Sequence, residues 1–333
     1  MYIAAPLIAF VISFLICLCA IYFTEKHNIF LDSHDSLKPQ KVHNTSTSRA
    51  GGLGIFCGAI LMCADYFPFA LFFLLAGFVT FAGGLVEDFR GTLSPKIRLL
   101  IQSLSAVLGI FLFNALIFDI GIPWHLPFAI SVLFTIFAVV GSINAVNIID
   151  GFNGLASGIS IMVLISLCLC AYMVGDMQIL YISLIVLCAS LGFLVLNFPK
   201  GKIFLGDGGA YFLGFCIVEI AILISQRHEQ ISSWFVLCIM IYPVYEVLFS
   251  AYRRKRKGLS PLYPDKMHLH TVIFRKITKN NYKTSILIWI LAAPFIFIPL
   301  LYMWHTKLLA ATVLLFILLY NLIYFRLVKS RMR

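Results

Sequence analysis

Long apolar segments follow one another along almost the whole chain, and short polar or glycine- and proline-containing connections separate them. A helix needs about 20 predominantly apolar residues to cross the hydrocarbon core of a bilayer. The pattern therefore predicts eleven spans, of which the second and the eighth are short or interrupted by glycine. These spans cover residues 2–23, 51–65, 69–86, 98–118, 127–143, 155–174, 178–197, 210–226, 232–252, 285–304 and 308–327.

The composition agrees with this pattern. Of the 333 residues, 61% are hydrophobic and 12% are charged, whereas a soluble domain is about half apolar and about a quarter charged. We therefore predict an all-α transmembrane bundle that forms a single membrane-embedded domain over residues 1–333. The nine cysteines lie inside apolar runs and indicate small apolar helix residues, not a disulfide framework or a zinc site.

The basic residues predict the orientation of the bundle. Eleven spans place successive connections on alternate sides, and every Lys and Arg except Arg227 and Lys307 then falls on the same side. The positive-inside rule puts that side in the cytoplasm, so the N-terminus lies outside and the C-terminus inside. The net charge of +11 is thus mainly a topology signal, with a second role at anionic headgroups or an anionic substrate, and does not indicate nucleic-acid binding. Its densest stretch, 253–284, is predicted to be a cytoplasmic loop.

Acidic residues lie on the same side, in segments rich in glycine or asparagine. GGLVEDFRG contains Glu87 and Asp88, NAVNIIDGFNGLASG contains Asp150, and FLGDGGAYFLG contains Asp207. Glycine allows close backbone approach to a ligand, and carboxylates suit Mg²⁺, which keeps phosphate oxygens among its ligands. One such Asp is usually a helix cap, but several on one face favour a polar cavity that holds a magnesium diphosphate.

The basic loop adds the motif PDKMHLHTVIFRK, which contains Asp265, His268 and His270. The two histidines are two positions apart, so they share a face on a strand and point apart on a helix. The motif is compatible with an interfacial histidine pair, with contact to a diphosphate, or with orientation of a carboxylate.

Together, GGLVED, NAVNIIDGFNGL, FLGDGGA and DKMHLH resemble the motifs of the polyprenyl-phosphate N-acetylhexosamine-1-phosphate transferases. The resemblance runs from about Arg49 to about Arg275. It implies Mg²⁺-dependent transfer, with Mn²⁺ as a possible substitute, of a sugar phosphate from a UDP-sugar to undecaprenyl phosphate. N-acetylglucosamine-1-phosphate is the default group, and UMP is released. It also implies a multi-pass protein of the bacterial inner membrane whose cytoplasmic site starts a lipid-linked glycan such as O-antigen or capsule, with membrane lipids as further partners.

The resemblance implies roles for individual residues. Glu87 and Asp88 match an acidic dyad that activates the lipid phosphate or binds metal, Asp207 matches a Mg²⁺-binding aspartate, and Phe204 matches an aromatic residue that stacks on uracil. Asp207 and Asp88 are thus the expected metal ligands. The remaining matched positions are Asn147, Asp150 and Asn153 near the nucleotide, Arg49, Lys96 and Arg98 near phosphates, and Asp265, His268 and His270 near the diphosphate.

Two departures and one rival interpretation accompany this assignment. Glu87 replaces the usual first aspartate of the dyad, and Thr271 replaces a histidine. The rival is a secondary transporter, which places polar groups near the bilayer midplane, often within inverted repeats. Glu219 and Glu246 are the embedded acids that would serve it, but the sequence shows no internal repeat. Donor sugar, glycan pathway and oligomeric state stay open, although TSTSRAGG and SPKIRLL favour a simple-sugar donor over a muramoyl-pentapeptide.

Overall fold

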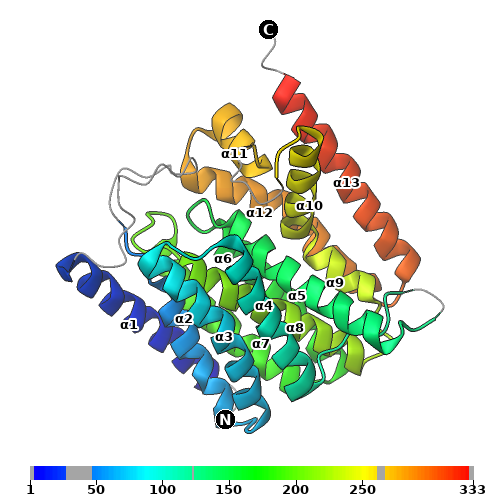
Figure 1. Ribbon diagram of the computed structural model, residues 1–333, viewed down its shortest axis with the longest axis horizontal. Coiled ribbons are helices and arrows are strands. Elements are labelled where there is room, and N and C mark those ends of the chain that lie inside the picture. Colours follow the sequence, from blue (N-terminus) through cyan, green and yellow to red (C-terminus); the bar gives the residue numbers. More distant parts are fainter. Residues whose placement is uncertain (1–3, 28–46, 122–123, 261–266, 330–333) are drawn as a thin grey trace.

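The computed structural model describes residues 4–27, 47–121, 124–260 and 267–329. Within these ranges the chain is helical apart from its connections and one isolated parallel bridge between Ser48 and Ile203 (Figure 1). The helices are α1 (Ala4–His27), α2 (Gly51–Ala59), α3 (Phe69–Arg90), α4 (Pro95–Phe113), α5 (Phe128–Ile149), α6 (Leu155–Val174), α7 (Met177–Asn197), α8 (Gly206–Arg227), α9 (Ser233–Ile239), α10 (Ile241–Arg256), α11 (Leu269–Ile273), α12 (Asn281–Phe297) and α13 (Thr306–Lys329). Shorter 3-10 or π-helical turns cover Ile60–Ala64, Phe274–Thr278 and Ile298–Tyr302.

The predicted helical membrane architecture is confirmed. Nine helices in the described part of the chain are long and apolar enough to cross a bilayer, and the bent pair α9 and α10 makes a tenth candidate. The second predicted span corresponds to a shorter apolar helix, Gly51–Ala64. Each of the predicted spans thus has a helical counterpart. The expected interruption of the eighth span is wrong, because α8 runs unbroken through its glycines for 22 residues.

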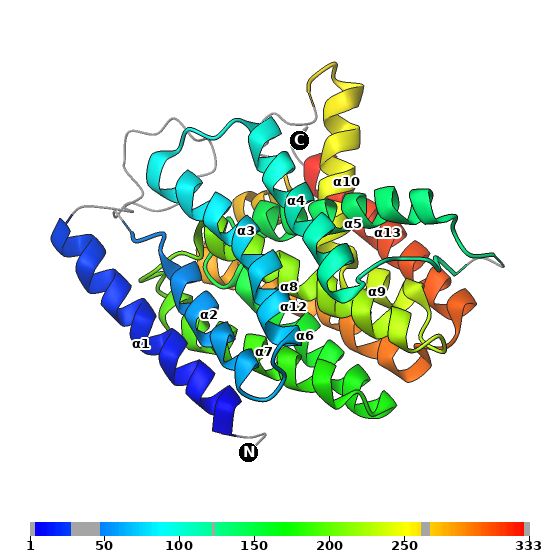
Figure 2. The ribbon, with the colours of Figure 1, turned by 60° about the horizontal axis from the view of Figure 1, so that its bottom comes forward.

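The ninth predicted span is bent, and its cause is local. The axes of α9 and α10 differ by 78° at Met240. Pro243 lies in the first turn of α10. Since proline has no N–H and its ring clashes with the carbonyl of Ile239, a straight helix through this point is disfavoured. Figure 2 shows α10 projecting beyond the other helices. The predicted loop 253–284 is therefore partly helical, with α10 extending to Arg256 and α11 lying within it.

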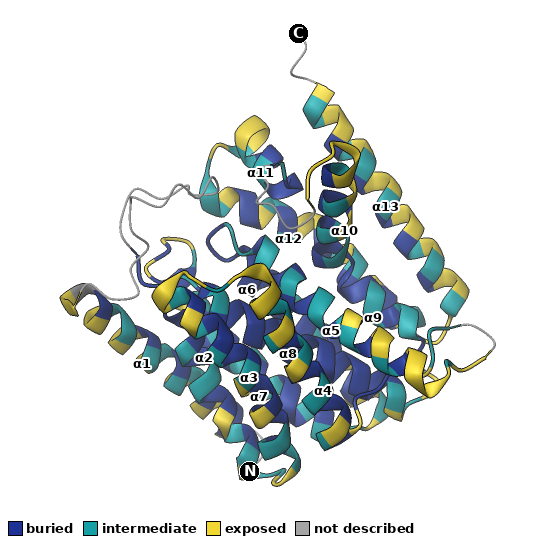
Figure 3. Cartoon of the chain, viewed as in Figure 1, coloured by how far each residue is buried: buried dark blue, intermediate teal, exposed yellow. Residues whose placement is uncertain are grey.

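Helix α8 lies at the centre of the bundle. The apolar window of α8 is 100% buried, whereas those of α1 and α13 are 22% and 28% buried. Figure 3 shows the same contrast, with buried ribbon concentrated in the middle and exposed residues recurring along α1 and α13. The outer helices thus present the apolar faces that a bilayer would cover, while α8 contacts other helices on all sides.

Glycine lets α2 and α3 approach the start of α8 closely. A methyl group on Gly52 would collide with the backbone of Gly209, and a methyl group on Gly84 would collide with that of Gly208. Small residues permit such backbone contacts between membrane helices. The contact at Gly84 brings the last turn of α3, with its acidic pair, against the first turn of α8.

Backbone hydrogen bonds fix the same junction from the other side. The Phe204 N–H donates to the Ser48 carbonyl at 2.7 Å, and the Gly51 N–H donates to the Phe204 carbonyl at 3.0 Å. Two residues after Phe204, Gly206 has φ of +76°, where a side chain would be strained. Segments distant in sequence thus meet at the end of the bundle where α8 begins.

Candidate active site

Asp88 connects α3 to α8. Its Oδ1 accepts a hydrogen bond from the Asp207 N–H and its Oδ2 accepts one from the Gly208 N–H, both at 2.9 Å. The first N–H groups of a helix lack partners within that helix, and a carboxylate there also complements the helix dipole. Asp88 therefore caps the start of α8 and fixes the backbone that carries Asp207.

Asp207 is the point where four helices converge. Its Oδ1 accepts a hydrogen bond from Asn147 Nδ2 of α5 at 2.7 Å. Its Oδ2 lies 4.0 Å from Arg98 Nη1 of α4, and its side chain stays 20% exposed. With Asp88 from α3, the structure brings together four of the residues singled out in the sequence. The Asp207 side chain is therefore partly accessible to a ligand.

Glu87 faces a different partner from Asp88, because consecutive residues on a helix point about 100° apart. Its Oε1 binds Arg98 Nη2 at 2.8 Å, and its Oε2 accepts a hydrogen bond from the Leu93 N–H at 2.9 Å. Arg98 also donates to the Leu93 carbonyl and to the Tyr211 side chain. Buried Glu87 thus holds Arg98 in place. Its hydrogen bonds and ion pair within the described residues go to Arg98 and Leu93, and not to Asp207.

Asp150 follows α5 directly and lies near Asp207. Burial and, second to it, the charge of Asp207 raise the pKa of the Asp150 carboxyl to about 7, against the opposing effect of the Arg49 guanidinium. Arg49 is half-buried just before α2. The cluster therefore contains carboxylates whose mutual repulsion is only partly offset by a basic side chain, which favours a cation at this place.

Three of the predicted ligand-binding residues have no hydrogen bond or ion pair to Asp207 among the contacts of the described residues. Asn153 is buried and binds the Pro199 carbonyl through Nδ2, and its own N–H donates to Asn281 Oδ1, so it fastens the loop after α5. Lys96 is exposed in the first turn of α4, about 200° around the helix from Arg98. Phe204 is half-buried.

The histidine motif reaches the same region, although its Asp265 lies outside the described residues. His268 and His270 stack nearly in parallel, with ring centroids 5.3 Å apart and an interplanar angle of 6°. Extended backbone at His268 precedes the helical turn at Leu269, which explains why the rings share a side. A methyl group on Gly151 would lie 3.8 Å from His270 Nε2, which places the pair against the Asp150 loop.

Burial controls the protonation of the second histidine. It lowers the pKa of His270 to about 4, with the nearby Glu246 carboxylate acting in the opposite direction and His268 in the same one. His270 is therefore neutral at physiological pH. Its Nδ1 lies 3.3 Å from the Tyr242 hydroxyl, so its Nε2 is the nitrogen on the side of Gly151.

Sequence reasoning missed the residues of α10 that contact the histidines. Glu246 was assigned only to the rival transporter, yet it is fully buried and lies 3.0 Å from His268 Nδ1. Tyr242, and likewise Tyr211 of α8, had no sequence feature that indicated a role, because each is an ordinary aromatic residue in an apolar run. For Glu246 the signal was present: an acid embedded in an apolar segment requires a partner.

The carboxylates fit a cation that brings its own phosphate ligands. In the described part of the chain, no three His, Cys, Asp or Glu side chains gather into a metal site made of protein alone. Mg²⁺ is commonly bound by one or two carboxylates together with substrate phosphates and water. Asp207, with Asp150 close by, meets that requirement. Each oxygen of Asp88 accepts one backbone hydrogen bond and keeps a second lone pair.

An apolar groove of about 430 Å³ lies between helices of the same bundle. It is bordered by α5, α8, α9 and α10, and its lining includes Phe137, Ser142, Val218, Met240 and Leu248. Helices α5 and α8 also carry Asn147 and Asp207, so the same two helices border the groove and the polar cluster.

Comparison with known proteins assigns the family. The model of glycosyl transferase family 4 matches residues 70–225, from α3 to near the end of α8. The undecaprenyl-phosphate alpha-N-acetylglucosaminyl 1-phosphate transferase of Yersinia pestis is 31% identical over 279 residues, which cover 79% of this chain and 75% of the relative. The chain belongs to glycosyl transferase family 4. The resemblance drawn from the motifs is thereby confirmed.

Other members of family 4 show similar agreement. The probable undecaprenyl-phosphate N-acetylglucosaminyl 1-phosphate transferase of Bacillus subtilis (strain 168) is 30% identical, again over 79% of this chain and 75% of the relative. The Escherichia coli (strain K12) enzyme is 31% identical over 252 residues, 71% of this chain and 67% of the relative. Family membership and the apolar helices together make this chain a multi-pass membrane protein. The region matched by the family model contains Glu87, Asp88, Arg98, Asn147 and Asp207.

Proposed function

We propose that this family 4 member transfers an N-acetylhexosamine-1-phosphate, most simply N-acetylglucosamine-1-phosphate, from a UDP-sugar to undecaprenyl phosphate. The names of its relatives support the acceptor and the sugar. The observation that carries the proposal is the convergence of Asp88, Arg98, Asn147 and Asp207 at the start of α8. Carboxylate and guanidinium groups at a helix N-terminus suit a magnesium-bound diphosphate.

The proposed reaction exchanges one phosphoanhydride bond for another. An oxygen of the lipid phosphate attacks the β-phosphorus of the UDP-sugar, the bond from that phosphorus to the bridging oxygen breaks, and UMP leaves with the bridging oxygen. The product is a lipid-linked sugar diphosphate. Catalysis of such transfers is mostly positioning and charge stabilisation. A lipid phosphate is largely ionised near neutral pH, since its second pKa is about 6, so the step needs no strong base.

Each protein group then has a task that its contacts support. Arg98, held by Glu87, directs guanidinium N–H groups toward phosphate oxygens, for which its planar fork is suited. Asp88 fixes the first turn of α8, and Asn147 orients Asp207. Phe204 would offer an aromatic face to uracil, and the histidine pair would approach the diphosphate from the Asp150 loop.

We propose Asp207 and Asp150 as the carboxylates that hold Mg²⁺, or Mn²⁺ in its place. The family motif assigns Asp88 as the second ligand, but its oxygens cap α8 in this structure. A bound Mg²⁺ would neutralise charge on the diphosphate and stabilise the leaving UMP. The repulsion between Asp150 and Asp207 would be relieved when the metal and substrate arrive.

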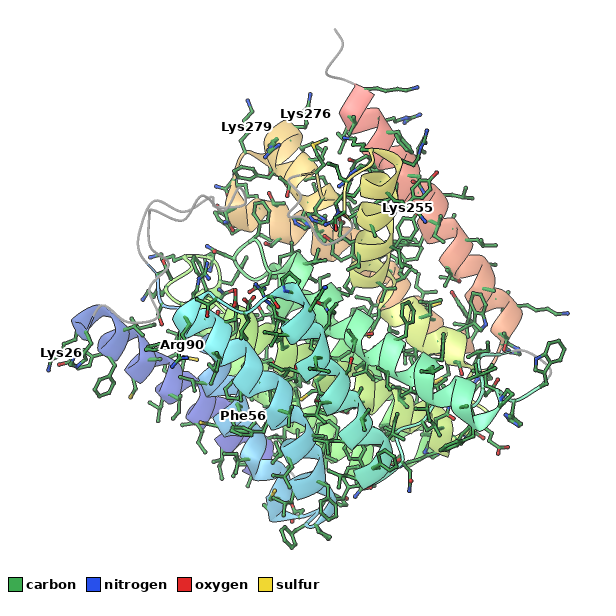
Figure 4. All side chains as sticks on the ribbon, in the orientation of Figure 1. Lys26, Phe56, Arg90, Lys255, Lys276 and Lys279 are labelled. Atoms are coloured by element: carbon green, nitrogen blue, oxygen red, sulfur yellow. The ribbon has the colours of Figure 1, made fainter. Side chains whose placement is uncertain are left out.

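The eleven-span topology, with the N-terminus outside and the site facing the cytoplasm of a bacterial inner membrane, belongs to the same proposal. Figure 1 draws the start of α1 and the end of α13 toward opposite sides of the molecule. The labelled basic side chains lie along one side in Figure 4, from Lys26 and Arg90 to Lys255, Lys276 and Lys279. This is the side on which α8 begins, which supports a cytoplasmic site.

The apolar groove supports a lipid acceptor. A polyprenyl chain entering from the bilayer requires an apolar surface, and the helices that border the groove, α5 and α8, also carry Asn147 and Asp207. The transporter alternative loses one of its two acids, because Glu246 lies against the histidine motif and not within a midplane binding site.

The test is an assay of purified protein with undecaprenyl phosphate, Mg²⁺ and a panel of UDP-sugars. We expect UMP release and a lipid-linked sugar diphosphate, detected by mass spectrometry, with UDP-N-acetylglucosamine as the best donor. Omission of undecaprenyl phosphate should stop UMP release. Absence of product with every donor, for protein that is folded in detergent, would contradict the proposed function.

A further inference from the structure

Two residues of α10 contact the two histidines in register. Tyr242 and Glu246 lie one turn apart on the same helix face. The Tyr242 hydroxyl lies 3.3 Å from His270 Nδ1, and Glu246 Oε1 lies 3.0 Å from His268 Nδ1. All four side chains are buried. The start of α11 is thus fixed to α10 through both rings.

Glu246 has a hydrogen-bond donor for each of its oxygens. Oε1 accepts a second hydrogen bond from the Leu269 N–H at 3.0 Å, and Oε2 accepts one from the Tyr320 hydroxyl of α13 at 2.9 Å. A buried carboxylate is costly unless such donors surround it. Three donors from two other segments converge on this one side chain, so its orientation is determined from several directions.

These contacts also determine the tautomer of His268. An ionised carboxylate only accepts hydrogen bonds, so the proton of neutral His268 lies on Nδ1. The two imidazole rings are nearly parallel and both present Nδ1 to α10. Their opposite edges therefore face away from α10, and for His270 that edge lies at the Asp150 loop.

We propose that Glu246 is a positioning residue of the transferase: it holds His268 with Nδ1 protonated and Nε2 facing the diphosphate, and Tyr320 holds Glu246. A carboxylate that fixes the orientation and tautomer of a histidine acts in the same way in catalytic triads. The role toward a diphosphate rests on the proposed function, whereas the tautomer rests on the contacts alone. The C-terminal helix α13 thereby takes part in the site.

The first test measures the tautomer without any assay of activity. Protein labelled with ¹⁵N-histidine, in detergent, should show His268 protonated at Nδ1 in the wild type. Glu246→Gln should shift that balance, because a Gln side chain can donate toward Nδ1. The His268 signal is identified by its loss in His268→Ala. Protonation of His268 only at Nε2 in the wild type, or an unchanged signal in Glu246→Gln, would overturn the proposal.

The second test is a double-mutant cycle on turnover. Glu246→Gln should lower kcat about 10- to 100-fold, as losses of orienting groups commonly do, with a smaller change in the KM for the UDP-sugar. In the His268→Ala background the same substitution should cost less than about twofold, since coupled residues are not additive. An equal loss in both backgrounds would show that Glu246 acts only through packing.

A pair of tyrosines supplies the matched control. Tyr245, on α10, accepts a hydrogen bond from Asn321 of α13 at 2.7 Å, at the same helix interface as Tyr320. Tyr320→Phe should lower kcat several-fold, and Tyr245→Phe should leave it unchanged. Equal effects would contradict the proposal. This pair also carries the test if Glu246→Gln fails to fold. If the wild-type protein is inactive with every donor, the proposed function is wrong. The ¹⁵N measurement would still show whether Glu246 fixes the tautomer of His268.

Discussion

Helix α8 carries two acidic residues whose surroundings differ completely. Asp207, in the first turn, is partly exposed and is met by Asn147 and Arg98. Glu219, about three turns further along, is fully buried, and neither of its oxygens has a hydrogen-bond partner in the described part of the chain. Its carboxyl occupies space that Gly109 of α4 leaves free. Convergent partners from several helices, and not burial of an acid by itself, distinguish the candidate site.

The strongest test of this difference makes the same chemical change, carboxylate to amide, at both positions. Asp207→Asn should lower turnover about 100- to 1,000-fold, the range seen when a charge-stabilising group is lost. Glu219→Gln should leave turnover within about twofold of the wild type, because it removes no contact of the site. Both are measured as UMP release by protein that elutes normally in detergent. Similar losses in the two variants would mean that the site is not confined to the start of α8.

A second comparison lies within the acidic pair of α3. Asp88→Asn should lower turnover about 10- to 100-fold, because an amide nitrogen cannot accept the backbone hydrogen bond that one oxygen now accepts at the start of α8. Glu87→Gln should cost less, since Glu87 contacts Arg98 and Leu93 and not the backbone that carries Asp207. Turnover and melting temperature of both variants check this order. The reverse order would mean that orientation of Arg98 is the more important task.

Phe204 tests the nucleotide side of the site. Removal of a base-stacking aromatic ring commonly costs about 1–3 kcal/mol, so Phe204→Ala should raise the KM for the UDP-sugar about tenfold and change kcat much less. Steady-state kinetics at saturating acceptor measure both constants. An unchanged KM would remove Phe204 from the uracil site. Phe198, which packs against Trp289, offers an aromatic control.

The smallest expected effect concerns stability and pH. Because the pKa of Asp150 is raised to about 7 in the folded protein, the folded state binds more protons than the unfolded state between about pH 4 and 7, and stability falls as the pH rises through that window. Asp150→Asn should therefore melt higher than the wild type at pH 8, and the difference should shrink toward pH 4. Melting curves in metal-free buffer measure this. A constant difference across the range would contradict the shifted pKa.

Hydropathy predicted the membrane fold well, because each span depends on its own residues. The rotation of each helix about its own axis could not be predicted in the same way, because it depends on contacts with other helices. The sequence placed Glu87 and Asp88 together, but which of them faces α8 depends on the contact between Gly84 and Gly208. The bend at Met240 was predictable in principle from Pro243, whose missing N–H marks a helix start.

The motifs identified candidate residues from distant segments of the chain, but they did not predict the contacts of every residue. Asn153 was assigned to the nucleotide loop, and its contact with the Pro199 carbonyl could not be predicted from the motif. Glu246 looked like an isolated embedded acid, because its contact with His268 spans 22 positions and a bent helix. Long-range side-chain pairs of this kind leave no periodic trace in one sequence.

The enclosure of α8 has a consequence for how the protein responds to its membrane. A bilayer that is too thick or too thin acts on the helices it touches, by tilting or shifting them. Helix α8 is shielded from lipid, so the spacing between Asp88 and Asp207 should be insensitive to acyl-chain length. Helix α13, largely exposed along its length, carries Tyr320 to Glu246. We therefore expect bilayer thickness to change turnover through the contacts of Tyr320 and Glu246 with the histidines, while the spacing between Asp88 and Asp207 stays unchanged.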